Sequence, residues 1–489
     1  MISKWMKLLA ALFAVSLVAA ACGSDAPSGA VAAVTDDGAA AASLEQAQDA
    51  ATAAQADADQ AKADLEAAQA DLEAATTGVE APVVREFEGQ VVQITGPERS
   101  AEEWNAIETA MEPFEEETGL SVIYTGSADW EAEINVQIAA GNPPDISIFP
   151  QPGKLADFAR EGFVNALPGD VFDSVSANWQ EAQMGFGLVD GEFYGVPVKN
   201  DLKSIVWHKP AVFEANGYEI PTTWDDLKAL TNTMIDDGVT PWCVGIESGQ
   251  ATGWVFTDWT EDLMLRFHGG DAYDQWVSNE LKFSSDEVTQ VMQEIIDLWS
   301  TDGAVFGGIE SIASTHFASK PAEDLIADNC AMVRQASFFA SFLPEGSSVD
   351  VDVFYFPSLT ADDKPVMGGG NLTGAFNTND ATWAVMDYMG SGEYANRRQA
   401  AQKAAKGGDG VLSGFNTANL NADKSLWEPL GQGFVTILQE APVFRFDGSD
   451  LMPADVGAGE FWTQATAMVN GEIDVAGGAA KIDEAWPTE

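Results

Sequence analysis

The chain has 489 residues, of which 46% are hydrophobic, and these are enough to fill one large core or two domains, so a small peptide-like module is excluded. Its 77 acidic and 23 basic side chains give a formal charge of -54, which would repel nucleic acid and anionic lipid headgroups, because both need Lys or Arg to replace their counterions. The sequence therefore predicts no nucleic-acid partner, and we interpret the acidity chiefly as an aid to solubility.

The first 21 residues have the order of a secretory signal peptide, with two lysines, an apolar run from Leu8 to Val18 and small residues before Cys22. This ending resembles the lipobox of bacterial lipoproteins, in which the cysteine is acylated and becomes the mature N-terminus, although Ala19 stands where leucine is usual. We predict a signal peptide over 1–21 and lipidation at Cys22, the alternative being an ordinary signal peptide with an incidental cysteine. The rest of the chain is expected to be extracytoplasmic, held to the outer face of the cell membrane by its lipid anchor only, or periplasmic.

Residues 22–83 form a predicted tether. From Ala26 to about Pro82 the composition shifts to Ala, Asp, Gln and Glu without an aromatic residue, so this stretch cannot bury a core of its own. It is rich in strong helix formers, and Leu65 and Leu72 stand one heptad apart, which leaves a coiled coil open. Because alanine occupies most of the positions that would face a partner helix in a coiled coil, we favour a solvated helical or flexible stalk that holds the next domain off the membrane.

Two further cysteines lie in a secreted context, where paired thiols usually oxidise, and we predict a disulfide between Cys243 and Cys330. The three histidines are scattered without ligand spacing, whereas zinc and copper sites normally need clustered His or Cys. The sequence accordingly predicts no metal and no other cofactor.

From Val84 onward the chain alternates strand-like and helix-like segments. Strands are predicted at GQVVQITG, LSVIYTG and DISIF. Apolar residues at helical spacing predict helices over Ala101–Thr118, over Asp129–Ala140 and from Gly153 to Glu161. This alternation predicts parallel strands joined by crossover helices, and such sheets bind ligands beyond the carboxyl ends of their strands. One rim is therefore expected to contain residues 96–99, 127–130 and 149–151.

The segment AAGNPPDISIFPQPG places one of these rim loops. Gly141 ends the preceding helix, and the two prolines after Asn142 forbid its continuation. Asp145 then starts the next strand, which carries Gln151 to the rim.

Five blocks of sequence stand in the order PFEEETGLSVIYTG, GNPPDISIFPQPG, GEFYGVPVKNDLKSIVWHKPAVF, PWCVGIESGQATGWVFTDWTEDLMLR and DLMPADVGAGEFW. Together they resemble the extracellular sugar-binding lipoproteins of ABC importers (family 1, maltose-binding-protein-like), in particular those for α-glucosides. The likeness covers about 84–487. It implies an α/β, two-lobed periplasmic-binding-protein fold of type II, in which each lobe is a mostly parallel sheet flanked by helices.

The resemblance implies a chain that crosses between the lobes more than once. We expect an N-lobe from 84–198 and 358–415, and a C-lobe from 199–357 and 416–489. The implied function is that of a monomeric substrate-binding component, not an enzyme. It would capture a neutral α-glucoside or short gluco-oligosaccharide by lobe closure and deliver it to ABC permease subunits in the membrane.

Sugar binding requires aromatic rings that stack on C–H faces, with planar donors and acceptors for the hydroxyls. The segment TGWVFTDWTED offers Trp254 and Asp258, which share one face of a helix, while Trp259 is expected in the core. The other expected ligand contacts come from rim loops or matching family motifs: Glu98, Asp129, Gln151, Lys199, Asn200, Gln335, Gly370, Asn371, Arg445 and Asp447. A core, cap or surface role is the alternative for each.

Other classes of protein have weaker support. GGGNLTG misses the dinucleotide-binding spacing, because Thr373 stands where the last glycine is needed, and we interpret it as a tight turn. Asp258 with Glu261 could serve glycoside hydrolysis, but the chain has no G-x-S-x-G, H-E-x-x-H or P-loop motif. The alternatives are a binding protein for a polyamine or peptide and, less favoured, a secreted glycoside-active enzyme.

Overall fold

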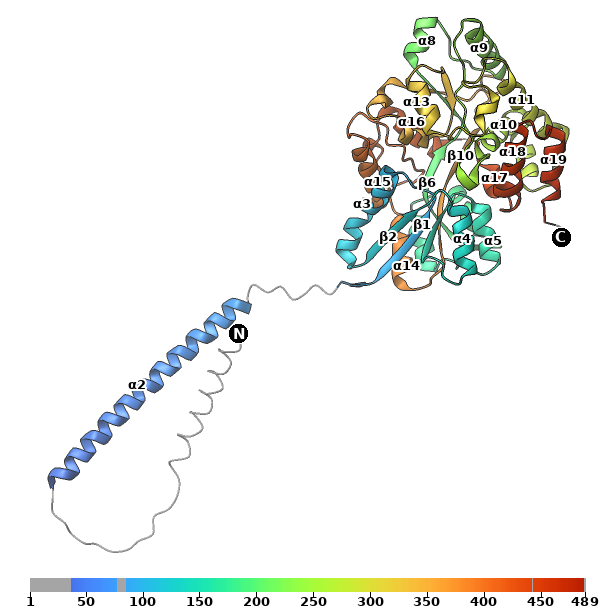
Figure 1. Cartoon of the computed structure of the whole chain (residues 1–489). Helices are drawn as coiled ribbons and strands as arrows, with labels where there is room; N and C mark the ends of the chain where they lie inside the picture. The colour runs from blue at the N-terminus through green and yellow to red at the C-terminus, as the bar shows by residue number, and fades with distance from the viewer. Residues whose placement is uncertain (1–36, 77–84, 442, 488–489) are drawn as a thin grey trace. The chain divides into compact units, whose positions relative to one another are not determined.

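The computed structural model describes residues 37–76, 85–441 and 443–487. The chain divides into two compact units, Met1–Val83 and Val84–Glu489 (Figure 1). The predicted signal peptide and Cys22 lie outside the described residues, so the lipid anchor stays a prediction. Within the described ranges, none of the helices combines the length and the apolar character needed to cross a bilayer.

In the described part of the first unit the chain forms helix α2 (Asp37–Thr76), so the predicted stalk is helical there. The side chains of residues 52–70 are exposed. Gln55 donates to Asp59 at 3.1 Å and Gln60 donates to Asp64 at 2.9 Å. Such pairs four residues apart support a helix that has no core to pack against.

The second unit, which we name the globular unit, contains a larger sheet in the order β11-β10-β3-β1-β2, with β6 also paired to β10. Its strands are β1 (Val91–Gly96), β2 (Ser121–Gly126), β3 (Ile146–Phe149), β6 (Gly195–Leu202), β10 (Val366–Ala375) and β11 (Phe444–Phe446). Strand β1 is parallel to both β2 and β3, which confirms the expected parallel strands over this stretch. Strand β10 is antiparallel to β3 and β6, so the sheet is mixed.

A smaller sheet has the order β8-β7-β9, from β7 (Ile205–His208), β8 (Met332–Arg334) and β9 (Asp352–Tyr355). Both pairings are antiparallel, so the expectation of a mostly parallel sheet in each lobe is wrong here. The reason is that β7 pairs with segments remote in sequence, and local strand–helix alternation sets the direction only of strands joined by a short crossover. A short hairpin, β4 (Leu188–Val189) with β5 (Glu192–Phe193), stands apart from both sheets.

Helices flank the two sheets. They are α3 (Ala101–Thr118), α4 (Trp130–Ala139), α5 (Pro152–Arg160), α6 (Gly169–Ser176), α7 (Glu181–Met184), α8 (Pro210–Asn216), α9 (Trp224–Asp236), α10 (Trp254–Val277), α11 (Asp286–Ser300), α12 (Ile309–Ile312), α13 (Ser319–Ile326), α14 (Asp380–Met389), α15 (Gly392–Ala405), α16 (Pro429–Glu440), α17 (Gly448–Leu451), α18 (Trp462–Val469) and α19 (Val475–Glu484). Helices α3, α4, α5 and α14 surround β1 and β2, whereas α8 to α11 and α13 occupy the other half of the globular unit (Figure 1). The helices expected over 101–161 are confirmed by α3, α4 and α5.

The chain passes between the two sheets at places where the sequence predicts lobe crossings. Strand β6 ends at Leu202 in the larger sheet and β7 begins at Ile205 in the smaller one. Strand β9 ends at Tyr355 and β10 begins at Val366, back in the larger sheet. Because the globular unit forms one compact body, the lobe boundaries 84–198, 358–415, 199–357 and 416–489 stay predictions.

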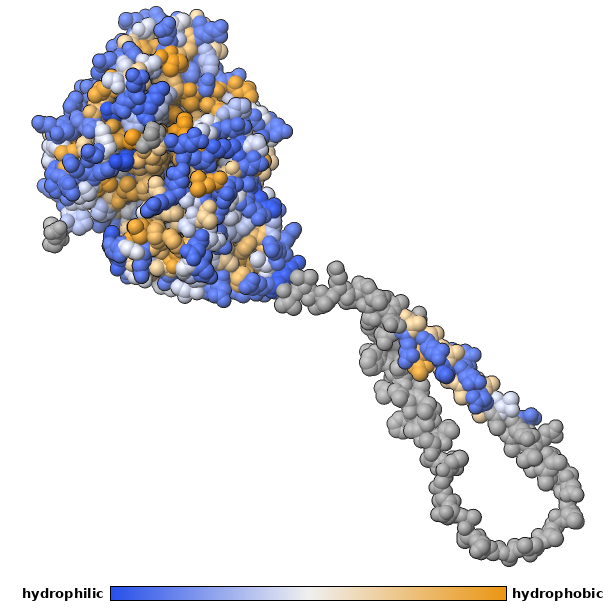
Figure 2. All heavy atoms as spheres, turned by 180° about the vertical axis from the view of Figure 1, so that it is seen from behind, coloured by the Kyte–Doolittle hydropathy of each residue, from blue (hydrophilic) through white to orange (hydrophobic). Residues whose placement is uncertain are grey.

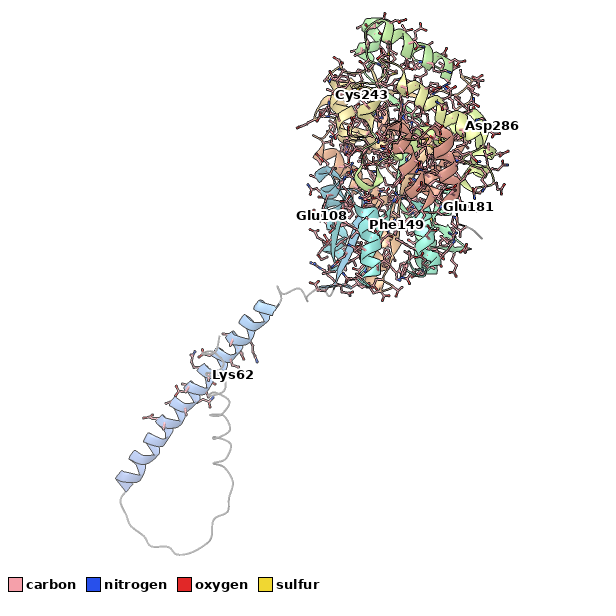
Figure 3. The ribbon with its side chains drawn as sticks, turned by 45° about the vertical axis from the view of Figure 1, so that its right-hand side comes forward. Lys62, Glu108, Phe149, Glu181, Cys243 and Asp286 are labelled. Atoms are coloured by element: carbon pink, nitrogen blue, oxygen red, sulfur yellow. A yellow bond between two sulfur atoms is a disulfide. The ribbon has the colours of Figure 1, made fainter. Side chains whose placement is uncertain are left out.

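The break after α4 follows the expected chemistry. Gly141 has a φ of 69°, in the left-handed region that suits glycine, and its N–H donates to the carbonyl of Ile138 at 2.9 Å. Strand β3 begins a few residues later, at Ile146, and ends at Phe149, which is labelled in Figure 3. The loop after it carries Gln151.

The motif GGGNLTG is a strand and not the expected tight turn, since β10 runs through it with a bulge between Asn371 and Leu372. Its glycines permit close approach of neighbours on both sides. A Cβ atom at Gly370 would lie 2.4 Å from the carbonyl oxygen of Lys199, and one at Gly368 would lie 2.5 Å from the ring of Phe444. Sheet packing, which the local sequence does not encode, thus explains the glycine run.

Cys243 and Cys330 form a disulfide across 87 residues of sequence, which confirms the predicted bridge. Cys330 lies just before β8, and Cys243 lies in the same half of the globular unit as α8 to α11 (Figures 1 and 3). The bridge therefore ties the segment before β8 to a loop between α9 and α10.

Candidate functional site

A cavity of about 260 Å³ lies at the carboxyl ends of β1 and β3. The loops after β1, β2 and β3 all contribute to its wall, through Pro97, Glu98, Arg99, Ala128, Pro150 and Gln151. Elements of the other half contribute Ser248, Ala251, Trp254, Phe317, Phe338, Phe342, Ser449, Asp450 and Trp462. The three loops expected to share one rim therefore meet at a cavity, as ligand-binding α/β sheets require.

Strand β6 and the residue after it line the wall with alternate side chains. Lys199, Asp201 and Lys203 are two residues apart, so they face the same side, and all three line the cavity. Asn200 lies between them and faces away, where its side-chain oxygen accepts from the N–H of Ala418 at 3.1 Å. Successive side chains of a strand point to opposite faces, so Asn200 points away from the side that Lys199 occupies. Asn200 therefore does not line the cavity, contrary to the expectation.

We name the first group of charges at the wall the Lys199 cluster: Lys199, Glu98, Glu103, Asp201 and Arg398. The Nζ atom of Lys199 lies 3.3 Å from Glu98, 3.6 Å from Asp201 and 3.9 Å from Glu103. Arg398, on α15, donates to Oε1 of Glu98 at 2.6 Å. Burial raises the pKa of Glu98, but Arg398 and Lys199 outweigh it and hold that pKa below its ordinary value. Glu98 is therefore a carboxylate, and its Oε2 has no hydrogen-bond partner in the described chain.

The second group is the Lys203 cluster: Lys203, Asp258, Asp447, Arg334 and Asp262. Lys203 donates to Oδ1 of Asp258 at 2.9 Å and also bonds Asp447. Arg334 donates to Oδ2 of Asp258 at 3.0 Å and to Asp262 at 2.9 Å. Asp258 is fully buried, does not line the cavity and has both oxygens bonded, so the structure leaves it no free oxygen for a sugar hydroxyl, contrary to the expectation.

Glu261 brings a further carboxyl to the Lys203 cluster. One oxygen each from Asp258, Glu261 and Asp447 lie within 4.8 Å of one another, a spacing that could suit a metal ion. The ammonium group of Lys203 already bonds two of these acids, so the cluster contains its own cation. Burial, and then repulsion from Asp447, raise the pKa of Glu261, whereas Lys203 and hydrogen bonds from its neighbours hold the pKa of Asp447 low against the effect of burial. Burial thus favours the protonated form of Glu261, while Asp447 beside Lys203 favours its charged form.

Aromatic side chains form the third part of the wall, and they are Trp254, Phe317, Phe338, Phe342 and Trp462. The ring centroids of Trp254 and Phe317 are 5.1 Å apart in an edge-on arrangement, and Nζ of Lys203 lies 5.4 Å from the Trp254 ring centroid. Gly253 has a φ of 117°, and a Cβ there would lie 2.3 Å from the carbonyl oxygen of Trp462. Only glycine lets the start of α10 approach Trp462 so closely.

Trp462 follows a single π-helical turn, Val456–Phe461, in which helical hydrogen bonds are one residue longer than in an α-helix. Such turns are rare and often occur at functional sites. Trp462 is almost fully buried, and its indole N–H has no partner in the described chain. The cavity thus combines aromatic rings, ion pairs and polar groups that still lack a partner.

Comparison with known proteins matches residues 100–396 to the model of the bacterial extracellular solute-binding protein family. The alpha-glucosides-binding periplasmic protein AglE of Rhizobium meliloti is 37% identical over 418 residues, which are 82% of this chain and 88% of AglE. The osmoprotective compounds-binding protein GgtB of Synechocystis is 36% identical over 399 residues, which are 79% of this chain and 90% of GgtB.

The chain belongs to this solute-binding family.

Solved structures agree on the fold. A chitin oligosaccharide binding protein superposes with a TM-score of 0.66 at 17% identity, covering 81% of this chain and 97% of that one. Maltose-bound MalE3 of T. maritima gives a TM-score of 0.64 at 16% identity, covering 81% of this chain and 98% of that one. The solute-binding protein therefore has the expected type II periplasmic-binding-protein fold.

Of the residues expected to contact ligand, the cavity brings together Glu98, Gln151, Lys199, Trp254, Gly370, Asn371 and Asp447. Their contact with a ligand stays a prediction. Trp259 is 1% exposed, which confirms it as a core residue. The helical spacing that grouped Trp254 with Asp258 places one at the wall and the other among buried cations.

Three other expected contacts lie elsewhere, each for a visible reason. Gln335 is buried, and its side chain forms hydrogen bonds with the surrounding backbone: it donates to the carbonyl of Phe317 at 3.2 Å and accepts from the N–H of Ala336. Arg445 forms a two-pronged ion pair with Asp274 at 2.7 and 2.8 Å. Asp129 is exposed at the start of α4.

Several residues of the wall were not expected from the sequence, among them Glu103, Glu131, Lys203, Phe317, Phe338 and Trp462. Two of these carried a usable signal. Lys203 continues the two-residue period from Lys199, and Trp462 closes the last family-like block, GEFW. The phenylalanines carried none, because they come from a loop and a 3-10 helix that only the tertiary fold brings to Trp254.

Proposed function

We propose that this solute-binding protein is the substrate-binding component of an ABC importer and captures a neutral, gluco-configured sugar, α-linked and short, by closing its lobes around it. The observation that carries the proposal is that four of the six carboxylates lining the cavity, Glu98, Glu103, Asp201 and Asp447, lie within ion-pair distance of Lys199 or Lys203, beside aromatic rings. Lys199 and Lys203 neutralise their neighbours, so the wall offers hydrogen-bonding capacity without a strong demand for a charged ligand.

A polyamine site would need carboxylates that remain charged and unpaired. Glu131 and Asp450 line the cavity without an ion pair to Lys or Arg in the described chain, but burial raises the pKa of both. Raised pKa values favour their neutral forms, which donate hydrogen bonds as sugar hydroxyls require. Glu98 and Gln151 each keep one oxygen without a partner in the described chain, and a ligand hydroxyl can supply it.

The size of the cavity argues for a short ligand. About 260 Å³ lies just below the roughly 300–1,000 Å³ common for drug-sized ligands. We therefore favour a disaccharide-sized solute over a long oligosaccharide. The α-glucoside class rests on AglE, whose name records alpha-glucosides.

Lobe closure and delivery complete the proposal. A ligand that contacts both halves stabilises the closed form, because differential contact is what shifts a hinge equilibrium. Delivery requires a membrane permease, and anchoring rests on Cys22. Replacing Cys22 with Ser should release the protein from the membrane, and a variant retained after high-salt washing would contradict the anchor.

The decisive experiment is calorimetric titration of the chain from residue 84 onward against α-linked and β-linked glucose disaccharides, longer glucans, spermidine and a tetrapeptide. We expect heat from an α-linked disaccharide and none from spermidine. Binding of spermidine or peptide alone would overturn the proposal. Continuous release of glucose would instead indicate an enzyme, although Asp258 and Glu261, the pair considered for hydrolysis, are fully buried outside the cavity wall.

A further inference from the structure

Helix α2 carries a seven-residue repeat that the proposed function does not use. Every leucine of the helix falls on one position of that repeat, which is occupied in turn by Leu44, Ala51, Ala58, Leu65 and Leu72. Three residues after each of these stands an alanine: Ala47, Ala54, Ala61, Ala68 and Ala75. We name these two rows the heptad seam, since they occupy the a and d positions of a coiled coil.

Polar side chains avoid the heptad seam. Between Leu44 and Ala75, each Asp, Glu, Lys, Gln and Thr lies at one of the other five positions of the repeat. Leu65 is 52% exposed, and the other seam residues from Ala54 to Ala68 are exposed as well. Figure 2 shows both apolar and polar residues on the surface of this part of the helix. A helix that only spans solvent does not need such segregation, because polar residues are equally suitable on all its faces.

We propose that the heptad seam binds a second copy of this chain in a parallel, two-stranded coiled coil. Charge complementarity selects this occupant and its direction. Asp57 directly precedes the seam residue Ala58, and Lys62 directly follows the seam residue Ala61. In a parallel pair these two flanking positions face each other across the interface, five residues apart in sequence, so Asp57 of each copy meets Lys62 of the other (Lys62 projects from α2 in Figure 3).

An antiparallel pair would have the opposite electrostatics. Asp57, Asp64 and Asp71 all precede residues of the a row, and antiparallel strands bring this flank of one copy against the same flank of the other. Aspartates would then face aspartates and repel. The repeat therefore favours copies that run in one direction, with both globular units following the same end of the pair.

The seam sets the strength of the pairing as well as its direction. Alanine buries less apolar surface than leucine, so the pairing is weak and depends on concentration. We expect the globular unit by itself to be a monomer, and the stalk to be the element that associates.

Disulfide capture in the full chain tests the pairing. Ala51→Cys places a thiol in the a row, five to six residues before the midpoint of the helix. It meets its own copy in an in-register parallel pair, whereas the two thiol positions would lie about 16 Å apart along the axis of an antiparallel pair aligned end to end. Ala56→Cys places the same thiol on the opposite face, and the parent chain controls for Cys22. Mild oxidation at the cell surface should crosslink the Ala51→Cys chain and leave the other two as monomers. Equal crosslinking of both variants, or of neither, would overturn the proposal.

Two variants that each introduce one aspartate test the heptad seam itself. In the Ala51→Cys chain, Ala58→Asp introduces a carboxylate into the seam, whereas Ala63→Asp introduces it on the outer face at the same cost in helix propensity. Most of the crosslinked product should be lost with Ala58→Asp and kept with Ala63→Asp, and sugar binding should stay unchanged in both. Equal loss would place the contact elsewhere and overturn the seam. Asp57→Lys should weaken the crosslink, and adding Lys62→Asp should restore it; lack of rescue would overturn the parallel register.

Discussion

The Lys199 and Lys203 clusters stand on the same strand face, four residues apart, yet they differ in what remains for a ligand. In the Lys199 cluster, Glu98 is charged, lines the cavity and keeps one oxygen without a partner in the described chain. In the Lys203 cluster, Asp258 is fully buried and both its oxygens are bonded. The carboxylates Glu98 and Asp258 therefore differ in role, because the unused hydrogen-bonding capacity of a carboxylate, and not its charge, decides whether it can contact a solute.

The largest effect is expected at Lys203. Lys203→Met removes the ammonium group from Asp258 and Asp447 and leaves buried carboxylates without it, so the free energy of unfolding should fall by about 3–5 kcal/mol. Denaturant unfolding without ligand measures the loss. Lys424→Met, at a partly exposed lysine, should change the free energy of unfolding by no more than about 0.5 kcal/mol. An equal loss of stability in both variants would contradict the expected difference between buried and exposed ion pairs.

The disulfide should rank second. Cys330 lies two residues before β8, which carries Arg334 of the Lys203 cluster. Replacing Cys243 and Cys330 together by Ala should lower the free energy of unfolding by about 2–4 kcal/mol through the larger entropy of the unfolded chain. A reductant should have the same effect on the parent protein, and a parent unaffected by reductant would contradict the role of the bridge.

Trp254 should affect affinity more than stability. Trp254→Ala removes a stacking surface at the wall and should cost about 1–3 kcal/mol, or roughly 5- to 150-fold in sugar affinity. Titration of the sugar identified in the panel measures it. Trp259→Phe, in the core, should leave affinity unchanged; a Trp254→Ala protein that binds as tightly as the parent would remove Trp254 from the site.

The Lys203 cluster should also make stability depend on pH. Burial, and then Asp447, raise the pKa of Asp258 from 3.8 to about 7 despite its cations. The folded protein then holds a proton that the unfolded chain has released, so stability is present at low pH and is lost as pH rises through about 7. From about pH 6 to pH 8 the loss should be about 1.4 kcal/mol, measured by denaturant unfolding at both values. Asp258→Asn should flatten this slope, and higher stability at pH 8 would contradict the assignment.

The smallest effect compares one carboxylate from each cluster. Glu98→Gln replaces a charged acceptor by a neutral one and should weaken sugar binding by about 1 kcal/mol, roughly fivefold. Asp258→Asn replaces a carboxyl group by an amide at a residue outside the wall and should alter stability while leaving affinity near that of the parent. If Asp258→Asn weakens sugar binding more than Glu98→Gln does, Asp258 and not Glu98 is the carboxylate on which affinity depends.

Local patterns were sufficient for the first part of the globular unit. The strands and helices from β1 to α5 follow from apolar spacing and from the stop at Gly141. The structure adds a cap at the start of α3, where the side chain of Ser100 accepts from Glu103 N–H at 3.1 Å. The rim at the cavity follows from the same pattern, since parallel strands end at one edge. These features depend on neighbours in sequence, which the sequence displays.

The distribution of roles among the site residues depended on distant neighbours. Asp258 and Lys203 are 55 residues apart, and Asp258 and Arg334 are 76 residues apart, so nothing near Asp258 shows that its oxygens are taken. The glycines of β10 resemble a turn until Lys199 and Phe444 are packed against them.

By itself, then, the sequence determined the family, the disulfide, the early strands and helices and the loops at the rim, because turn chemistry, periodicity and short motifs act within a few residues. Only the tertiary structure decided that Trp254 lines the cavity while Asp258 is sealed behind Lys203, and that Asn200 faces away. Burial and hydrogen-bond satisfaction are properties of the surroundings of a side chain, and in this fold those surroundings come from strands and helices far apart in the chain.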